Sequence, residues 1–163
     1  MAKVSKVATS AGPPAELYER DYYAWILAQV SALRERRIED IDWENVAEEI
    51  EGLAKSEKRG LRNQIARLYE HLLKLAYARG RRLEQNRRGW QLTVESACRD
   101  IDELLEESPS LVPKVNELLP RAYESGRIAA LIATNLPEKA IPQQPLWTFD
   151  KVMDDDFLPD EPA

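Results

Sequence analysis

The sequence predicts an all-α protein, a helical bundle of four to five helices with a long central helix and an extended C-terminal strap. Apolar residues recur at three- and four-residue steps along most of the chain, which is the spacing of amphipathic helices. Only six glycines occur in 163 residues, and alternating runs of β-branched and aromatic residues, which would indicate strands, are missing. With 44% hydrophobic and 32% charged residues, the composition is typical of a globular domain that buries a core.

The chain divides into three predicted segments. Residues 1–14 end in two prolines and are expected to form a flexible leader. Residues 15–136 are expected to form the helical bundle domain. Residues 137–163 hold half of the prolines and are expected to form a strap docked on the bundle, because its apolar side chains are unsuited to a free tail. These side chains are Trp147, Phe149, Val152 and Phe157, and they surround one expected helical turn over residues 148–153.

The first expected helix runs from about residue 15 to residue 37. Its apolar face combines Tyr18, Tyr22, Trp25, Ile26, Val30 and Leu33. Asp42 then provides a good N-cap for the central helix, because its carboxylate can accept hydrogen bonds from the amides of the first turn. From Asp42 to about Ala78 no proline interrupts the helical spacing, so we expect one helix or two collinear helices that break at Gly60.

The second half of the chain is expected to hold two more helices. A basic, polar connection over residues 79–89 precedes a helix from Trp90 to Glu107. In the next helix, Ser110 is a potential cap and Pro120 is expected to kink or split the helix. A face of small residues suits close helix contact, and the helix is expected to end at residues 135–137. The small face consists of Val115, Leu119, Ala122, Gly126, Ala129 and Ala133.

Several stretches of the chain resemble the bacterial "domain of unknown function 29" family. The most specific stretch is DIDWENVAEEIEGLAKSEKR, and RRGW, EESPSL, AYESGR and FLPD add to it, so the resemblance covers roughly residues 18–160. Pro120 and Tyr77 depart from the pattern that we expect for the family. The resemblance implies an all-helical fold, and it implies no activity, substrate or catalytic residue.

Charge is unevenly distributed along the chain. Residues 52–94 carry 11 basic and 3 acidic side chains, whereas the remainder carries 12 basic and 26 acidic ones. The basic excess continues into ARGRRLEQNRRGWQ, where arginines could bind phosphates and an indole could stack on a base. Surface ion pairs and an acidic protein partner are the alternatives. The candidate binding residues are Arg79, Arg81, Arg82, Arg87, Arg88 and Trp90.

Three further residues are candidates for a polar core, namely Glu48, Glu49 and His71. A metal site between helices would require Glu-x-x-His pairs, and residue 67 is an arginine, so we expect no metal and no cofactor. We expect His71 to bond a carboxylate or carbonyl, and Glu48 or Glu49 to pair with an arginine or cap a neighbour. Cys98 is in phase with core positions and is expected to act as a small hydrophobic residue.

The apolar stretches are too short to span a membrane, and the first residues lack the apolar region of a secretory signal. A single cysteine fits a reduced, cytoplasmic protein.

The sequence favours a non-catalytic helical protein-interaction module over an enzyme. The expected partner is another protein in a small regulatory complex, or a second copy in a homodimer. The alternative is a nucleic-acid-binding module that uses the Arg79–Arg88 segment. A third interpretation is an enzyme built around His71 and the Glu48–Glu49 pair, and it predicts a pocket that joins them.

Overall fold

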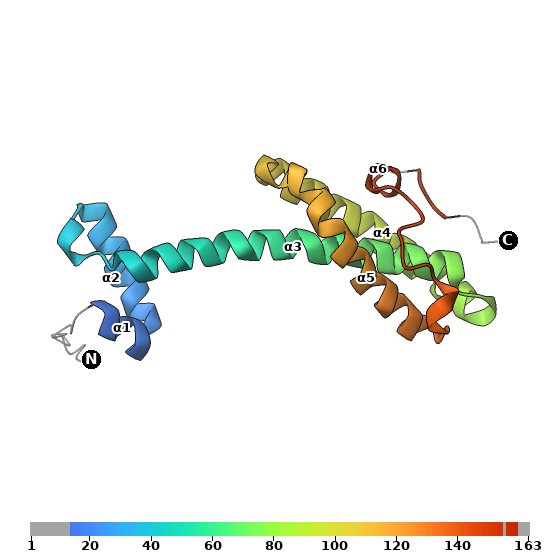
Figure 1. The fold of residues 1–163 in the computed structure, drawn as a ribbon, viewed down its shortest axis with the longest axis horizontal. Helices are drawn as coiled ribbons and strands as arrows, with labels where there is room; N and C mark the ends of the chain where they lie inside the picture. Colours follow the sequence, from blue (N-terminus) through green and yellow to red (C-terminus); the bar gives the residue numbers. More distant parts are fainter. Residues whose placement is uncertain (1–13, 155, 160–163) are drawn as a thin grey trace, which may run out of the picture. The chain divides into compact units, whose positions relative to one another are not determined.

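The computed structural model describes residues 14–154 and 156–159, and within these ranges it contains helices and no strand (Figure 1). The all-α prediction is therefore confirmed. The α-helices are α1 Pro14–Arg20, α2 Tyr22–Glu35, α3 Trp43–Tyr77, α4 Gly80–Glu107, α5 Val115–Thr134 and α6 Phe149–Val152. The 3-10 helices are η1 Ile38–Asp40, η2 Pro109–Lys114 and η3 Glu138–Ala140.

The chain forms two compact units, of which the first ends at Lys55 and the second begins at Ser56. The boundary between the units falls inside α3. The domain limits predicted at residues 14–15 and 136–137 differ from this division and stay a prediction. The expected flexible leader lies, except for Pro14, outside the described residues. Among the described helices, none has the length and apolar character that a membrane crossing requires.

The expected single helix over residues 15–37 is wrong, because the chain breaks at Asp21 into α1 and α2. The Asp21 carboxylate accepts a hydrogen bond of 3.0 Å from the Ala24 amide and so starts a new helix. At the other end, Arg36 takes a left-handed conformation with φ of 56° and stops α2.

The buried face of α2 also differs from the predicted face. Trp25, Gln29 and Ala32 are buried, whereas Tyr22 and Leu33 are exposed. Gln29 Oε1 accepts a 2.8 Å hydrogen bond from the Asp42 amide, and the Trp25 indole donates to the Asp42 carboxylate at 3.2 Å. Hydrogen bonds to the start of α3 therefore accompany the burial of this face.

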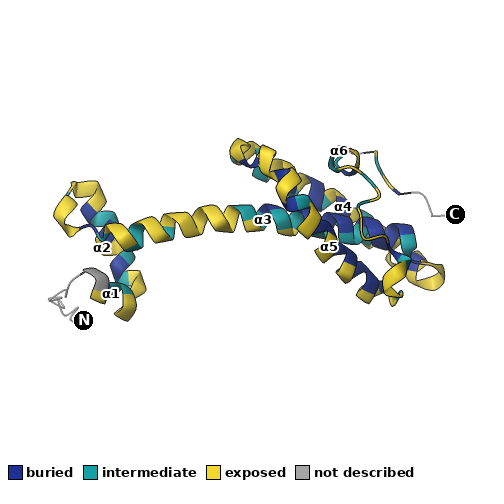
Figure 2. Ribbon diagram, in the orientation of Figure 1, coloured by how far each residue is buried: buried dark blue, intermediate teal, exposed yellow. Residues whose placement is uncertain are grey.

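Helix α3 is continuous from Trp43 to Tyr77 and passes through Gly60 without a break. The predicted N-cap is confirmed, because Asp42 Oδ1 lies 3.4 Å from the Asn45 amide and the Asp42 carbonyl accepts from the Val46 amide at 2.9 Å. Figure 2 shows that α3 changes from mostly exposed in its first half to mostly buried in its second half.

The basic connection expected at residues 79–89 is instead the beginning of α4. Only Ala78 and Arg79 separate α3 from α4. Gly80 has φ of +57°, a left-handed conformation that glycine adopts without a steric penalty, and this allows so short a turn. The predicted end of this helix at Glu107 is confirmed.

Helix α5 is not split at Pro120, which lies exposed within it. Ser110 lies inside η2 and does not cap α5, which follows Lys114. The close contact expected of the small face is present at Gly126, where an added Cβ would lie 2.4 Å from the Ala66 carbonyl oxygen. The buried face is nevertheless shifted from the prediction, since Leu118 and Ala130 are buried in it while Ala133 is exposed.

The C-terminal strap packs on the core of the second unit. Ile141 and Val152 are fully buried there, and Trp147, Phe149 and Phe157 pack against the same core. The strap is also tied by hydrogen bonds from two buried phenols, since Tyr69 donates to the Trp147 carbonyl at 3.0 Å and Tyr123 to the Pro142 carbonyl at 2.8 Å. The predicted helical turn is α6, capped by the Thr148 side chain.

Candidate interaction surface

The Glu49 carboxylate is held by two phenols of the first unit. The Tyr18 and Tyr22 hydroxyls each donate to it at 2.7 Å. These hydrogen bonds lower the pKa of Glu49 and raise the pKa of Tyr18 to about 12. The expected arginine partner of Glu49 is therefore replaced by tyrosines. Glu48 is exposed and belongs to no polar core.

His71 is half-buried in the second unit and its Nδ1 lies 2.9 Å from the Arg67 carbonyl oxygen. A carbonyl only accepts, so Nδ1 carries the proton. Burial lowers the pKa of His71, which keeps the ring neutral at neutral pH. The expected carbonyl bond is confirmed. Since Glu49 and His71 are each engaged inside their own unit, the enzymatic interpretation gains no support.

Two of the predicted arginines bond to the carbonyl ends of helices. Arg79 Nη1 donates to the Ala76 and Ala78 carbonyls at 2.7 and 2.9 Å, next to the end of α3. Arg82 Nη1 donates to the Ala133 carbonyl in the last turn of α5 at 3.0 Å. Cations at these ends also complement the helix dipoles. Both side chains therefore have a structural use.

The other predicted arginines, Arg81, Arg87 and Arg88, are exposed and make no ion pair or hydrogen bond within the described part of the chain. Arg81 and Arg88 are seven residues apart and share one face of α4. Trp90 lies on the opposite side of the helix from these two arginines, half-buried against the core, with Lys74 Nζ 5.8 Å from its ring centroid. The structure therefore keeps the indole apart from Arg81 and Arg88, whereas Arg87, three residues before Trp90, neighbours it on the helix surface.

Cys98 is buried, with its sulfur 3.7 Å from the Val152 carbonyl oxygen, as a small core residue would be. Within residues 14–154 and 156–159, no group of three or more histidine, cysteine or carboxylate side chains is arranged to hold a metal ion.

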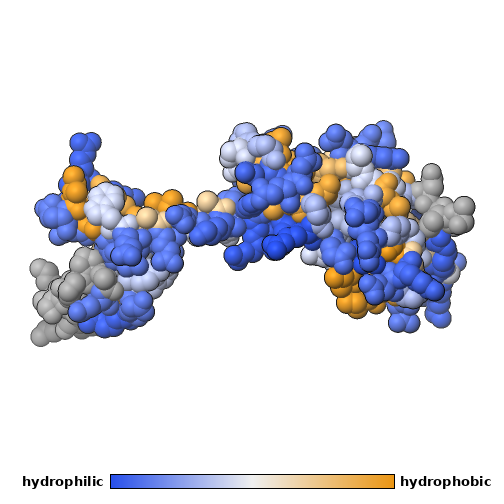
Figure 3. Space-filling model, viewed as in Figure 1, coloured by the Kyte–Doolittle hydropathy of each residue, from blue (hydrophilic) through white to orange (hydrophobic). Residues whose placement is uncertain are grey.

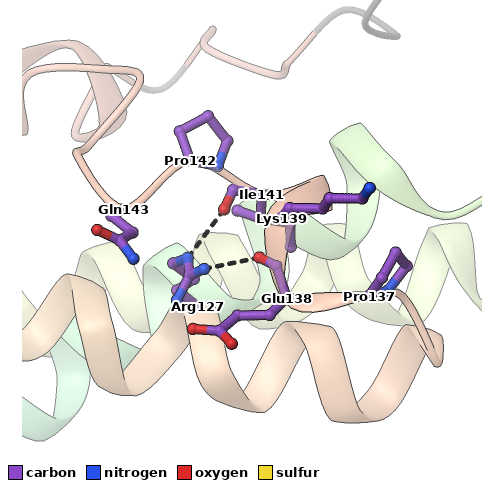
Figure 4. Close-up of a pocket in the computed structure, with 7 residues that line it drawn as sticks. All are labelled: Arg127, Pro137, Glu138, Lys139, Ile141, Pro142 and Gln143. Carbon is purple, nitrogen blue, oxygen red and sulfur yellow. Dashed lines mark hydrogen bonds between the residues drawn. The ribbon is translucent and has the colours of Figure 1, made fainter.

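A hollow of about 690 Å³ lies where the strap leaves α5 (Figure 4). Arg127 is one of the residues that line it. The Arg127 Nε donates to the Ile141 carbonyl at 2.9 Å, and its Nη2 donates to the Glu138 carbonyl at 2.7 Å. Arg127 Nη1 pairs with Glu124 at 3.3 Å. Each nitrogen of this guanidinium thus has a partner inside the protein, and Arg127 fastens the strap to α5.

The surface that sequence reasoning missed is an exposed apolar row on the first half of α3. We define the exposed α3 stripe as Trp43, Ala47, Ile50, Leu53 and Ala54, all of which are exposed. Trp43 is 57% exposed, Ile50 61% and Leu53 68%. Figure 3 shows apolar side chains at the surface over this part of the helix.

The stripe repeats the spacing of the buried core of the second unit. Trp43, Ala47, Ile50 and Ala54 precede Leu61, Ile65, Leu68 and Leu72 by 18 residues each. Eighteen residues are about five turns of an α-helix, so the two rows lie on the same face of α3. The later row has 0% exposure at all four positions. The same pattern on the same helix is therefore covered in one unit and uncovered in the other.

Helix α2 exposes further apolar side chains in the first unit. Tyr22, Tyr23, Leu27 and Leu33 are each at least 46% exposed. The burial of Trp25, Gln29 and Ala32 leaves these side chains on other sides of the helix.

Fold and surface together describe an all-helical protein with a packed core in its second unit and uncovered apolar rows in its first. The family model described as "Domain of unknown function DUF29" matches residues 17–158. The chain belongs to this family, and the resemblance seen in the sequence is confirmed. Neither the curated proteins nor the solved structures contain a match.

Proposed function

We propose that this protein is a non-catalytic protein-interaction module and that the exposed α3 stripe is its docking surface. The observation that carries the proposal is the 18-residue repeat, in which one face of α3 is buried over residues 61–72 and exposed over residues 43–54. A cytoplasmic location and a place in a small regulatory complex belong to the same proposal.

Energetics supports this use of the stripe. Full burial of a large apolar side chain contributes about 1.5–3 kcal/mol, and the stripe offers three such side chains in Trp43, Ile50 and Leu53. Tryptophan at the centre of an interface is also among the residues that most often dominate binding energy. Helix α2 of the same unit exposes further apolar side chains that a partner could cover.

Co-purification from the organism that encodes the protein tests the proposal. Tagged wild-type chain is compared with Ile50→Gln and with the matched control Ile132→Gln, which changes an isoleucine of α5 that is 76% exposed, against 61% for Ile50. We expect one or more proteins to be recovered with the wild type and the control and lost with Ile50→Gln. Identical recovery with all three chains would contradict the proposed docking surface.

The second candidate function is nucleic-acid binding through Arg81, Arg87 and Arg88. It is favoured by the exposure of these side chains and by their lack of a partner within the described part of the chain. Binding titrations on DNA and RNA at two salt concentrations test it. Phosphate contacts predict binding at low salt that weakens as salt rises. Absence of binding at low salt, or affinity that does not change with salt, would refute this function.

A further inference from the structure

We infer that the occupant of the exposed α3 stripe is an amphipathic helix of another protein, with lysine or arginine side chains beside its apolar face. This inference rests on the proposed function and adds the shape and charge of the partner. It is based on how the second unit covers the same face of α3 and on the charges that border the stripe.

The second unit shows what kind of element fits this face. The row of residues 61–72 lies in the hydrophobic core of that unit, together with side chains of α4 and α5. Helix α5 packs beside this row, where Gly126 faces the backbone of residues 66–70 and the Tyr123 ring meets the Tyr69 ring edge-on, with centroids 5.3 Å apart. The first row has the same four-three-four spacing as the buried row, so a helix can pack on it ridge into groove.

The length of the stripe fixes the size of the occupant. From Trp43 to Ala54 there are 11 steps along the helix, or about 16 Å at about 1.5 Å per residue. A partner helix of about three turns covers this distance. That is the size of a helical docking segment, which binds through anchors at i, i+3, i+4 and i+7.

The charge beside the stripe selects a basic partner. Glu44 and Glu51 each follow a stripe residue by one position, so both carboxylates border the same side of the row, and both are exposed. Glu51 forms an exposed ion pair with Lys55 at 3.2 Å. Glu44 makes no ion pair within the described residues. Across residues 14–55 there are 11 acidic and 5 basic side chains, a net charge of −6. Opposite charge on the partner would speed its approach and set its orientation.

A second copy of the chain is a poorer occupant. Pairing two stripes would bring two acidic borders and two negatively charged units together, and like charges in an interface are unfavourable. The basic segment of a second copy does not fit either. On α4, Arg81, Gln85 and Arg88 share their exposed face with a single large apolar residue, Leu92, and Leu83 is buried in the core, so no apolar row like the stripe accompanies these charges.

Fluorescence anisotropy with two designed peptides tests the inference on the full chain. Both fluorescein-labelled peptides have one leucine row at helical spacing and the same helix propensity. In one peptide lysines border the row, and in the other glutamates do. The protein variants are Ile50→Gln with its control Ile132→Gln, and the double variant E44Q/E51Q with its control E103Q/E106Q. The control glutamates are exposed on α4. Circular dichroism shows whether each variant is folded.

We expect the lysine peptide to bind and the glutamate peptide to bind at least about tenfold more weakly. Ile50→Gln should weaken binding of the lysine peptide about tenfold, as the loss of one buried aliphatic side chain predicts. E44Q/E51Q should weaken it severalfold and make it less dependent on salt. The two control variants should change the affinity less than about twofold.

Three results would overturn the inference. Equal binding of both peptides, or no effect of E44Q/E51Q, would show that the border charges do not select the partner. No binding of either peptide would show that a helix of this kind does not dock. A dimer in sedimentation that Ile50→Gln dissociates would make a second copy the occupant. In each case co-purified proteins that are lost with Ile50→Gln would leave the proposed function standing, since that experiment does not depend on the charge of the partner.

Discussion

The replacement of two side chains on the same face of α3 by alanine should have very different effects on stability. Leu68 and Ile50 stand 18 residues apart at equivalent positions, and the first is fully buried while the second is 61% exposed. Leu68→Ala removes buried groups and leaves a cavity, which costs about 2–5 kcal/mol. Ile50→Ala should change the free energy of unfolding by less than about 0.5 kcal/mol, because it is a surface change and alanine favours the helix.

The difference is measured by urea unfolding and by thermal unfolding, both followed by circular dichroism at dilute protein concentration. For a chain of this size about 1 kcal/mol corresponds to a change in Tm of about 2–4 °C. Leu68→Ala should therefore lower Tm by at least about 4 °C, while Ile50→Ala leaves it within about 2 °C of the wild type. If Ile50→Ala costs as much as Leu68→Ala, the stripe is already covered in the isolated protein and the reasoning is refuted.

Three other predictions concern packing, ionisation and the strap. Gly126→Ala should destabilise the protein by about 1–3 kcal/mol, because its Cβ meets the backbone of α3. Gly60→Ala, where an added Cβ meets nothing within 4 Å, should stabilise by up to about 1 kcal/mol; equal effects in urea unfolding would refute this packing. Tyr18 should ionise at pH about 12 in an absorbance titration, and Glu49→Gln should return its pKa toward 10. The raised pKa means that this contribution to stability is present below pH 10 and is lost as pH rises toward 12. Arg127→Met should expose the strap to proteolysis, because the two hydrogen bonds from its guanidinium to the Ile141 and Glu138 carbonyls of the strap are lost; unchanged cleavage of residues 137–154 would show that Arg127 does not hold it.

Much of the fold could be predicted from local signals. Asp42 was identified as a helix cap because an aspartate stands directly before a long periodic segment. The end of α5 at Asn135 followed from the Asn-Leu-Pro sequence, since asparagine tolerates the left-handed conformation that it adopts with φ of 56°. The docked strap was predicted because its aromatic residues are too apolar to remain in water.

The helix boundaries that were missed depend on weaker signals or on tertiary contacts. Asp21 lies inside an uninterrupted periodic segment, and only its capping bond to the Ala24 amide reveals the break. The start of α4 was hidden because a run of arginines suggested a polar connection, while Gly80 allowed a turn of two residues. The buried face of α2 was shifted because Gln29 bonds the Asp42 amide, a partner that hydrophobic periodicity does not consider.

The candidate surface could not be predicted for a similar reason. Periodicity reveals that residues 43–54 and 61–72 present the same apolar face, but it contains no information on which part is covered. The arginines were singled out because they are dense in the sequence, yet Arg79 bonds to carbonyls at the end of α3 and Arg82 to a carbonyl of α5, which approaches it only in the folded chain. Which basic side chains remain exposed is thus decided by tertiary structure.

The most direct test of the docking surface is a photo-cross-linking scan along α3 in the organism that encodes the protein. A photoactivatable amino acid replaces, one at a time, the stripe residues Trp43, Ala47, Ile50 and Ala54, and the off-face residue Gly52, which lies on the other side of the helix. We expect one common adduct from the four stripe positions and none from Gly52. Adducts of equal yield from all five positions, or from Gly52 alone, would contradict the docking surface.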